Sequence, residues 1–238
     1  MTEAVSMQIP VLDIPECSPD LETLDISLTR GQGLSKVMLY EYLRHAKGLK
    51  RLEADGVWIL LEDVYRAHGT DKNQSQEYEE EHEQRHEPQQ QEQLQLPSPE
   101  KPSCHGWASQ DTLQYLNIGF TSPDRGTQKC HAMFSLLSSL TSLEHLYLSY
   151  TCLNLTPVAG FHQLQALTRL RTFSIETCGY APLNKEDVLW MAAAWPKIEK
   201  IYVNLPGSSK ERQLRTWLKE AHREDVVIES QQSMMWWY

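Results

Sequence analysis

A short pattern of apolar positions, apolar-x-x-apolar-x-apolar, returns along the whole chain. Its complete copies begin at Leu21, Leu113, Leu143, Leu170 and Ile198, and a degraded copy begins at Leu49. The step between successive copies is 28 from Leu21 to Leu49, and it is 30, 27 and 28 between the copies from Leu113 to Ile198. Because strand side chains alternate between two faces, each copy predicts a short strand with one buried face. A further step of 28 from Ile198 reaches Val226, which predicts a closing strand at 226–228.

Between these strands the apolar spacing becomes helical, so each unit is predicted to be a strand, a turn and an amphipathic helix. The helical faces are Leu34, Val37, Met38, Tyr42 and Leu43; Met133, Leu136, Leu137 and Leu140; Val158, Phe161, Leu164 and Leu167; Val188, Met191, Ala192 and Trp195; and Leu214, Trp217 and Leu218. Gly48 and Pro196 follow two of these helices as stop signals.

Strand–helix units of this length resemble leucine-rich repeats of the long, helix-containing type. The phrases CSPDLETLDI at 17–26 and LTSLEHLYL at 140–148 are similar to those in the repeat half of fungal F-box/leucine-rich-repeat proteins. The resemblance implies an α/β solenoid, with a curved parallel sheet on the concave side and helices on the convex side. Stacking is needed because one unit cannot bury its own apolar face.

One interruption divides the repeats. The step of 64 from Leu49 to Leu113 exceeds one unit of 28 by 36, and the segment 69–103 is rich in Gln and Glu with few large apolar residues. Such a segment cannot bury enough apolar surface to fold, so we predict a disordered insertion. The predicted organisation is an N-terminal segment at 1–16, repeats at 17–68 and 104–230, the insertion at 69–103, and an apolar tail at 231–238.

The net charge of the 238 residues is -10, from 32 acidic against 22 basic side chains. This balance argues against nucleic acid and anionic membranes as partners. The insertion alone carries nine acids and three bases, so -6 of the total belongs to it. No apolar run approaches the ~20 residues that cross a bilayer. With no secretory signal, the expected location is intracellular, either cytoplasmic or nuclear.

The sequence HEQRH at 82–86 matches the H-E-x-x-H signature, in which two histidines bind zinc and the Glu acts as base. The alternative function is therefore a metal-dependent hydrolase that uses His82, Glu83 and His86. We favour a chance match, because the flanks are Glu and Gln tracts rather than a packed helix. The expectation is a protein that is no enzyme, with no catalytic residue, metal or cofactor.

Other reactive residues lack the context that chemistry needs. The five cysteines are widely spaced without a C-x-x-C pair, so free buried thiols are expected. The pairs Cys104-His105 and Cys130-His131 are adjacent in sequence and have no orienting acid. The basic residues Lys210, Arg212, Arg215, Lys219 and Arg223 predict either a solvated helix face or a contact for an acidic partner. The tail at 231–238 is either a cap or a partner-binding peptide.

The concave face carries the better functional candidates, because Tyr and Arg are frequent binding hot spots. Alternation places there Thr23, Asp25, Ser27, Arg51, Glu53, Asp55, Tyr115, Asn117, His145, Tyr147, Ser149, Thr172, Ser174, Glu176, Lys200, Tyr202 and Asn204. The predicted partner-binding residues are Arg51, Glu53, Tyr115, Asn117, His145, Tyr147, Ser174, Glu176, Lys200 and Tyr202.

The expected function is a protein–protein interaction scaffold. The resemblance implies recognition of substrates for an SCF-type ubiquitin ligase. We recognise no F-box segment in this sequence, so ligase components are expected as partners only if an F-box is supplied elsewhere.

Overall fold

The computed structural model describes residues 21–26, 39, 43–67, 107–121, 127–151, 153, 155–177 and 183–230. The predictions for 1–16, for the insertion at 69–103 with its HEQRH motif, and for the tail at 231–238 lie outside these residues.

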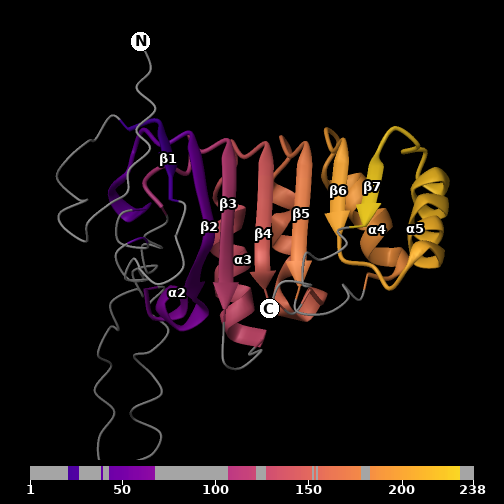
Figure 1. Ribbon diagram of the computed structural model, residues 1–238, viewed down its shortest axis with the longest axis horizontal. Coiled ribbons are helices and arrows are strands. Elements are labelled where there is room, and N and C mark those ends of the chain that lie inside the picture. Colours follow the sequence, from indigo (N-terminus) through magenta and orange to yellow (C-terminus); the bar gives the residue numbers. More distant parts are fainter. Residues whose placement is uncertain are drawn as a thin grey trace, which may run out of the picture.

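Within these ranges, seven parallel strands form one sheet, in which every strand pairs with the next one along the chain (Figure 1). They are β1 (Thr23–Asp25), β2 (Arg51–Leu60), β3 (Tyr115–Thr121), β4 (His145–Thr151), β5 (Thr172–Thr177), β6 (Lys200–Val203) and β7 (Val227–Ser230). The fold is therefore α/β with a parallel sheet, as the alternating strand and helix patterns predict.

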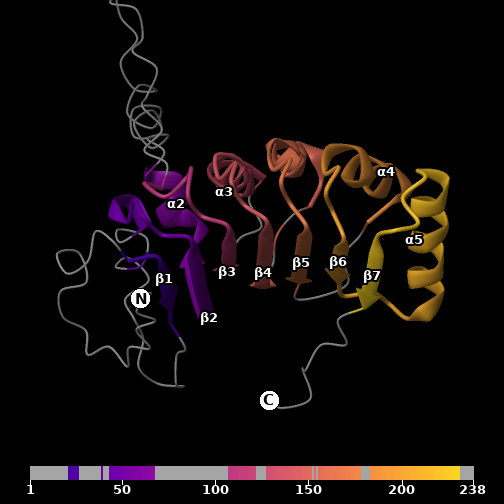
Figure 2. The same cartoon turned by 90° about the horizontal axis from the view of Figure 1, so that it is seen from above.

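The helices lie on one side of this sheet, and α5 lies beyond β7 at its end (Figure 2). They are α2 (Leu61–Ala67), α3 (Thr127–Ser138), the 3-10 helices η3 (Pro157–Ala159) and η4 (Phe161–Ala166), α4 (Lys185–Ala194) and α5 (Ser208–Glu220). We call the opposite side of the sheet, which no described helix covers, the open face. It corresponds to the concave side of the sequence prediction.

The strand register repeats the spacing of the apolar pattern. Thr23 pairs with Arg51 and Thr172 with Lys200, each at a step of 28, and Tyr115 pairs with His145 at a step of 30. Arg51 pairs with Tyr115 across the insertion, which is the same step of 64 as from Leu49 to Leu113. The predicted alignment of these strands is confirmed.

The last strand departs from the predicted step. Lys200 pairs with Val227, so the step is 27 rather than 28, and β7 spans Val227–Ser230 rather than 226–228. The reason is burial: Ile228 is 1% exposed in the core, whereas Val227 is 37% exposed on the open face. A shift by one residue would exchange these two side chains between the faces.

One apolar side chain from every strand meets its neighbours in the core between sheet and helices. This row is Leu24, Leu52, Leu116, Leu146, Phe173, Ile201 and Ile228, all buried. Met133, Leu136 and Leu137 of α3 and Val188 and Met191 of α4 pack against the sheet as predicted.

Between β4 and β5 the described residues contain no α-helix, and the predicted amphipathic helix around 158–167 is wrong. Its place is taken by η3 and η4, which are separated by Gly160 in the left-handed region at φ 90°. Pro157 begins the first of them. Phe161 and Leu164 are nevertheless buried, so the two short helices fill the same layer.

Candidate functional site

Strand register arranges the side chains of the open face in two rows that cross all seven strands. The first row is Thr23, Arg51, Tyr115, His145, Thr172, Lys200 and Val227. The second row is Asp25, Glu53, Asn117, Tyr147, Ser174, Tyr202 and Glu229. Nine of the ten predicted partner-binding residues lie in these rows, and Glu176 follows two residues after Ser174 on β5.

A cation stacked on a tyrosine occupies the β2–β3 part of this face. The guanidinium carbon of Arg51 lies 3.6 Å from the centroid of the Tyr115 ring. Arg51 also forms an ion pair with the carboxylate of Glu53 on the same strand. The contact arises because Arg51 and Tyr115 are register neighbours on adjacent strands. The ring and the carboxylate together hold the guanidinium in place.

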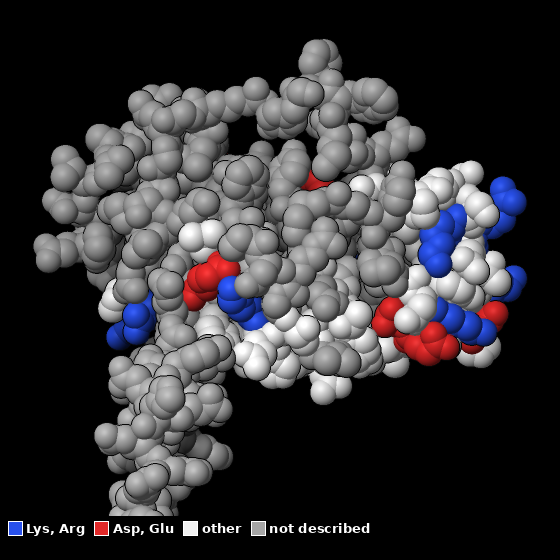
Figure 3. Space-filling view, turned by 90° about the horizontal axis from the view of Figure 1, so that it is seen from below, with Lys and Arg blue, Asp and Glu red and all other residues white. Residues whose placement is uncertain are grey.

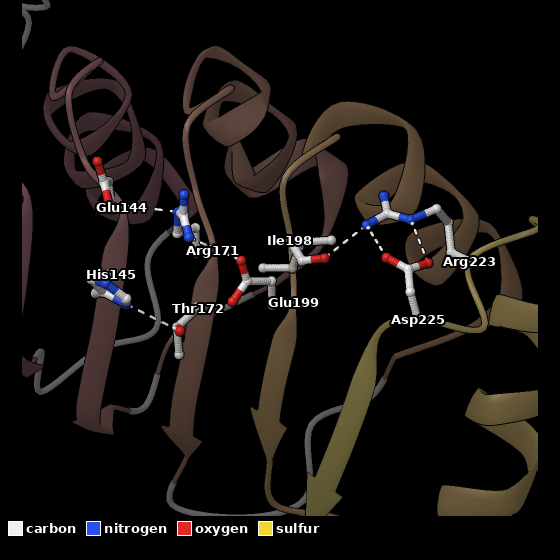
Figure 4. A network of polar contacts seen from close by, with 8 residues as sticks. All are labelled: Glu144, His145, Arg171, Thr172, Ile198, Glu199, Arg223 and Asp225. Atoms are coloured by element: carbon white, nitrogen blue, oxygen red, sulfur yellow. Dashed lines mark hydrogen bonds and ion pairs between the residues drawn. The ribbon is translucent and has the colours of Figure 1, made fainter.

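Three aromatic rings meet next to this pair. The Tyr115 and Tyr147 ring centroids lie 5.3 Å apart at an interplanar angle of 37°, and the Tyr115 and His145 centroids lie 6.1 Å apart. His145 Nδ1 and Thr172 Oγ1 share a hydrogen bond of 3.1 Å (Figure 4). We call Arg51, Tyr115, His145 and Tyr147 the aromatic cluster. Its rings and polar groups are already positioned by one another.

Burial sets the protonation of these groups. Desolvation lowers the pKa of His145 below 6.5, so the imidazole is neutral at pH 7. Desolvation also raises the pKa of Tyr115 and of Tyr147 above 10.0, although Arg51 opposes the rise at Tyr115 and a hydrogen bond with Thr172 opposes it at Tyr147. Both phenols therefore stay protonated and can donate hydrogen bonds.

Small residues form the floor of the face between larger ones. Ser174 is a register neighbour of Tyr147 on one side and of Tyr202 on the other, and it is 3% exposed. Thr172, between His145 and Lys200, is 6% exposed. Ser174 was predicted to contact a partner, but at this exposure it offers almost no surface. The two tyrosines beside it are half-buried and offer more.

A ladder of opposite charges runs along the strand ends next to the first row, and the sequence prediction missed it. Arg171 lies between two acids, with its Nε 3.7 Å from Glu144 and its Nη1 3.1 Å from Glu199 (Figure 4). Lys50 and Glu22 form a similar pair at 2.6 Å. All five residues occupy the second position of the repeat, so the alternation of sign at that position was the available signal.

The predicted basic helix is partly engaged within the chain. Arg223 is not on α5 but follows it, and donates to the carbonyls of Ala192 and Trp195. It also donates to the Ile198 carbonyl (Figure 4). On α5, Arg215 pairs with Glu211 at 2.9 Å, and the Lys210 ammonium lies 4.8 Å from the Trp217 ring centroid. Figure 3 shows Lys and Arg side chains, with Asp and Glu among them, at the end of the molecule where α5 lies.

Of the two cysteine–histidine pairs, the structure describes Cys130-His131, and its two side chains are not placed to react together. Cys130 is buried, while the next residue, His131, is exposed, so the two side chains lie on different sides of α3. Cys104 and His105 lie outside the described residues. Within the described part of the chain, no three His, Cys, Asp or Glu side chains are grouped to hold a metal ion.

None of the helices among the described residues is long and apolar enough to cross a bilayer. Comparisons of the chain with protein-family models, with curated proteins and with solved structures give no match.

Proposed function

We propose that this chain is a leucine-rich-repeat solenoid that acts as a protein–protein interaction scaffold, without an enzymatic activity of its own. The target binds the open face. The observation that carries the proposal is the aromatic cluster, because its side chains are held in place on a sheet face that no described helix covers. The match between strand register and the repeat step of 27 to 30 supports the solenoid part of the proposal.

The chemistry of the face suits a protein target. Tyrosine and arginine supply large contact areas and appear often among the residues that dominate binding energy. Their entropy cost on binding is reduced here, because stacking and the ion pair already restrict Arg51, Tyr115 and Tyr147. Because Thr172 and Ser174 are small and buried, the tyrosine rings beside them offer the larger contact surface.

The sequence resemblance extends this proposal to a cellular role. In that role, the chain holds targets for an SCF-type ubiquitin ligase, and its location is cytoplasmic or nuclear. The adaptor subunit of the ligase would then be recovered together with the target, provided that an F-box is present in the assembly.

A pull-down with the purified chain as bait tests the scaffold proposal. Tyr147→Ala and Tyr202→Ala remove rings from the open face, while Arg212→Ala removes an exposed side chain from α5 as a matched control. We expect a set of proteins that wild type and Arg212→Ala recover and that both tyrosine variants lose. Circular dichroism confirms that each variant is folded. Equal recovery of every protein by all four baits would refute binding through the open face.

A further inference from the structure

We propose that the partner presents an arginine or lysine side chain to Tyr202 and Glu229, which lie side by side on β6 and β7. This inference rests on the proposed function, because it names the chemistry of the partner at the same open face.

Within the open face, one arginine of the chain itself already contacts both a tyrosine ring and a carboxylate. Arg51 lies over the Tyr115 ring at 3.6 Å and pairs with the carboxylate of Glu53. The spacing of this sheet therefore lets one guanidinium contact a tyrosine ring and a carboxylate together. Stacking on an aromatic face and pairing with an acid are the two interactions that a guanidinium makes best.

Tyr202 and Glu229 offer the same two groups at the other end of the face. They are direct register neighbours on β6 and β7, so their backbones are about 4.8 Å apart. Tyr202 is half-buried and Glu229 is exposed. Among the described residues, no cation lies over the Tyr202 ring and no base pairs with Glu229. A basic side chain from a partner would complete the arrangement.

The charge of the face favours the approach of a basic partner. Among the residues of the two rows and Glu176, acids outnumber cations by four to two, which gives a net charge of -2, since His145 is neutral at pH 7. The acids are Asp25, Glu53, Glu176 and Glu229, and the cations are Arg51 and Lys200. The neighbouring charge ladder adds a further net -1, from three acids against two bases. Complementary charge of this kind steers association and selects between partners.

The positive charge of Lys200 repels a basic side chain of the partner, and its position indicates where that side chain can lie. It precedes Tyr202 by two residues on β6, which places their backbones about 7 Å apart. Its neighbour on the charge ladder is Glu199. A partner cation is therefore expected beyond Tyr202, on the side of Glu229 and away from the Lys200 ammonium.

A titration of the full chain with a defined probe tests the site. The probe is N-acetyl-arginine amide, and the neutral control is N-acetyl-citrulline amide, which has nearly the same shape. We expect the arginine probe to shift the backbone amide NMR signals of β6 and β7, with binding several-fold tighter than for citrulline. Glu229→Gln and Tyr202→Leu should each weaken binding by about two- to fivefold. Glu224→Gln, an exposed acid outside the face, serves as the matched control and should change nothing.

Equal shifts by both probes, or an arginine response that survives Tyr202→Leu and Glu229→Gln, would overturn the inference. The pull-down separates this failure from failure of the scaffold proposal. If Tyr147→Ala loses the target while Glu229→Lys retains it, the scaffold stands and the basic-partner inference is wrong. If neither variant loses a protein, both the scaffold proposal and the basic-partner inference are wrong.

Discussion

The side chain of Arg223 ties the last unit of the sheet to the unit before it. Its Nη1 donates to the carbonyls of Ala192 and Trp195 at 3.1 and 3.3 Å, and its Nη2 donates to that of Ile198 at 2.7 Å. The side chain is only 17% exposed. Ala192 and Trp195 stand at the end of α4, where carbonyls lack helical partners and the helix dipole favours a cation; the Trp195 carbonyl also accepts from the Ile198 N–H at 3.0 Å. We predict that Arg223→Ala loosens the fold at this end.

The expected loss is about 3 kcal/mol of unfolding free energy. A hydrogen bond from a charged donor contributes roughly 1.5–3 kcal/mol. Three such bonds would not be additive, because they share one guanidinium and water can reach the partly buried carbonyls after truncation. The pair with Asp225 adds little, since that carboxylate is exposed. For a chain of this size, about 3 kcal/mol corresponds to a fall of about 6–12 °C in Tm.

Thermal unfolding by circular dichroism measures the global change, and hydrogen exchange locates it. We expect the amides of β7 and α5 to lose more protection in Arg223→Ala than those of β3 and β4, because the last unit opens first. Arg223→Lys should lie between wild type and Arg223→Ala, since one ammonium cannot reproduce the planar fork.

Arg212→Ala provides the control for losing an arginine that makes no such carbonyl contacts among the described residues, because Arg212 is exposed on α5. It should change the free energy of unfolding by no more than about 0.5 kcal/mol. If Arg223→Ala also stays within that limit, or if β7 keeps its protection, the three carbonyl contacts do not stabilise the fold and the reasoning fails.

Three further predictions concern the core, the charge ladder and the aromatic cluster. Trp195→Phe should cost about 1–3 kcal/mol, measured by urea unfolding, because it removes the hydrogen bond from the buried Trp195 Nε1 to the Leu164 carbonyl at 2.9 Å and replaces a fully buried ring with a smaller one; the Leu164 carbonyl keeps its bond from the Leu167 N–H at 3.0 Å. Arg171→Ala should cost less than about 1 kcal/mol despite two acidic neighbours, because the Arg171 side chain is 48% exposed, and the loss should shrink further in 1 M salt. A larger, salt-independent loss would contradict this. For His145, the folded state binds a proton less readily than the unfolded chain, since burial lowers its pKa below 6.5. Its contribution to stability is therefore full above about pH 6.5 and is lost as the pH falls through the folded pKa. Urea midpoints at pH 7.5 and 5.5 should differ less in His145→Gln than in wild type, and an unchanged difference would refute this.

The apolar repeat was sufficient to predict the strands, their order and most of their register. Alternation separated Leu146 and Leu148 in the core from His145 and Tyr147 on the open face, because the period of two holds along each strand. The surplus of the insertion could be subtracted because the copies on both sides kept their pattern. Strand alternation depends only on neighbouring residues, and the step between copies depends only on residue counts, so the sequence alone was enough to predict both.

Two of the errors, at 158–167 and at β7, arose where an apolar run fits more than one structure. Phe161, Leu164 and Leu167 are spaced by three, which is the period of a 3-10 helix as much as one face of an α-helix. Pro157 and Gly160 were the signals that favoured the shorter helices. At β7, three apolar residues in succession left the register open, and the polar Glu229 after Ile228 was the signal that Ile228 faces the core.

Contacts between side chains were beyond the sequence pattern, because they depend on which rotamers neighbouring strands allow. Alternation placed Arg51 and Tyr115 on one face but gave no reason for the guanidinium to lie over the ring. The position of Arg223 was hidden for a related reason. Its partners are backbone carbonyls 25 to 31 residues earlier, which no side-chain pattern encodes.

The net charge of -10 describes the chain less well than the separate charges of its parts. The insertion carries -6 of this charge by sequence, while the charges of the open face belong to described residues of the sheet. Charges farther apart than about 8–10 Å are largely screened at physiological salt. Acids of the open face act on a bound partner at contact distance, so a partner selected by charge should respond to Glu229→Lys far more than to neutralising acids within 69–103. Equal responses to both changes would mean that the insertion, and not the face, sets the electrostatics of binding.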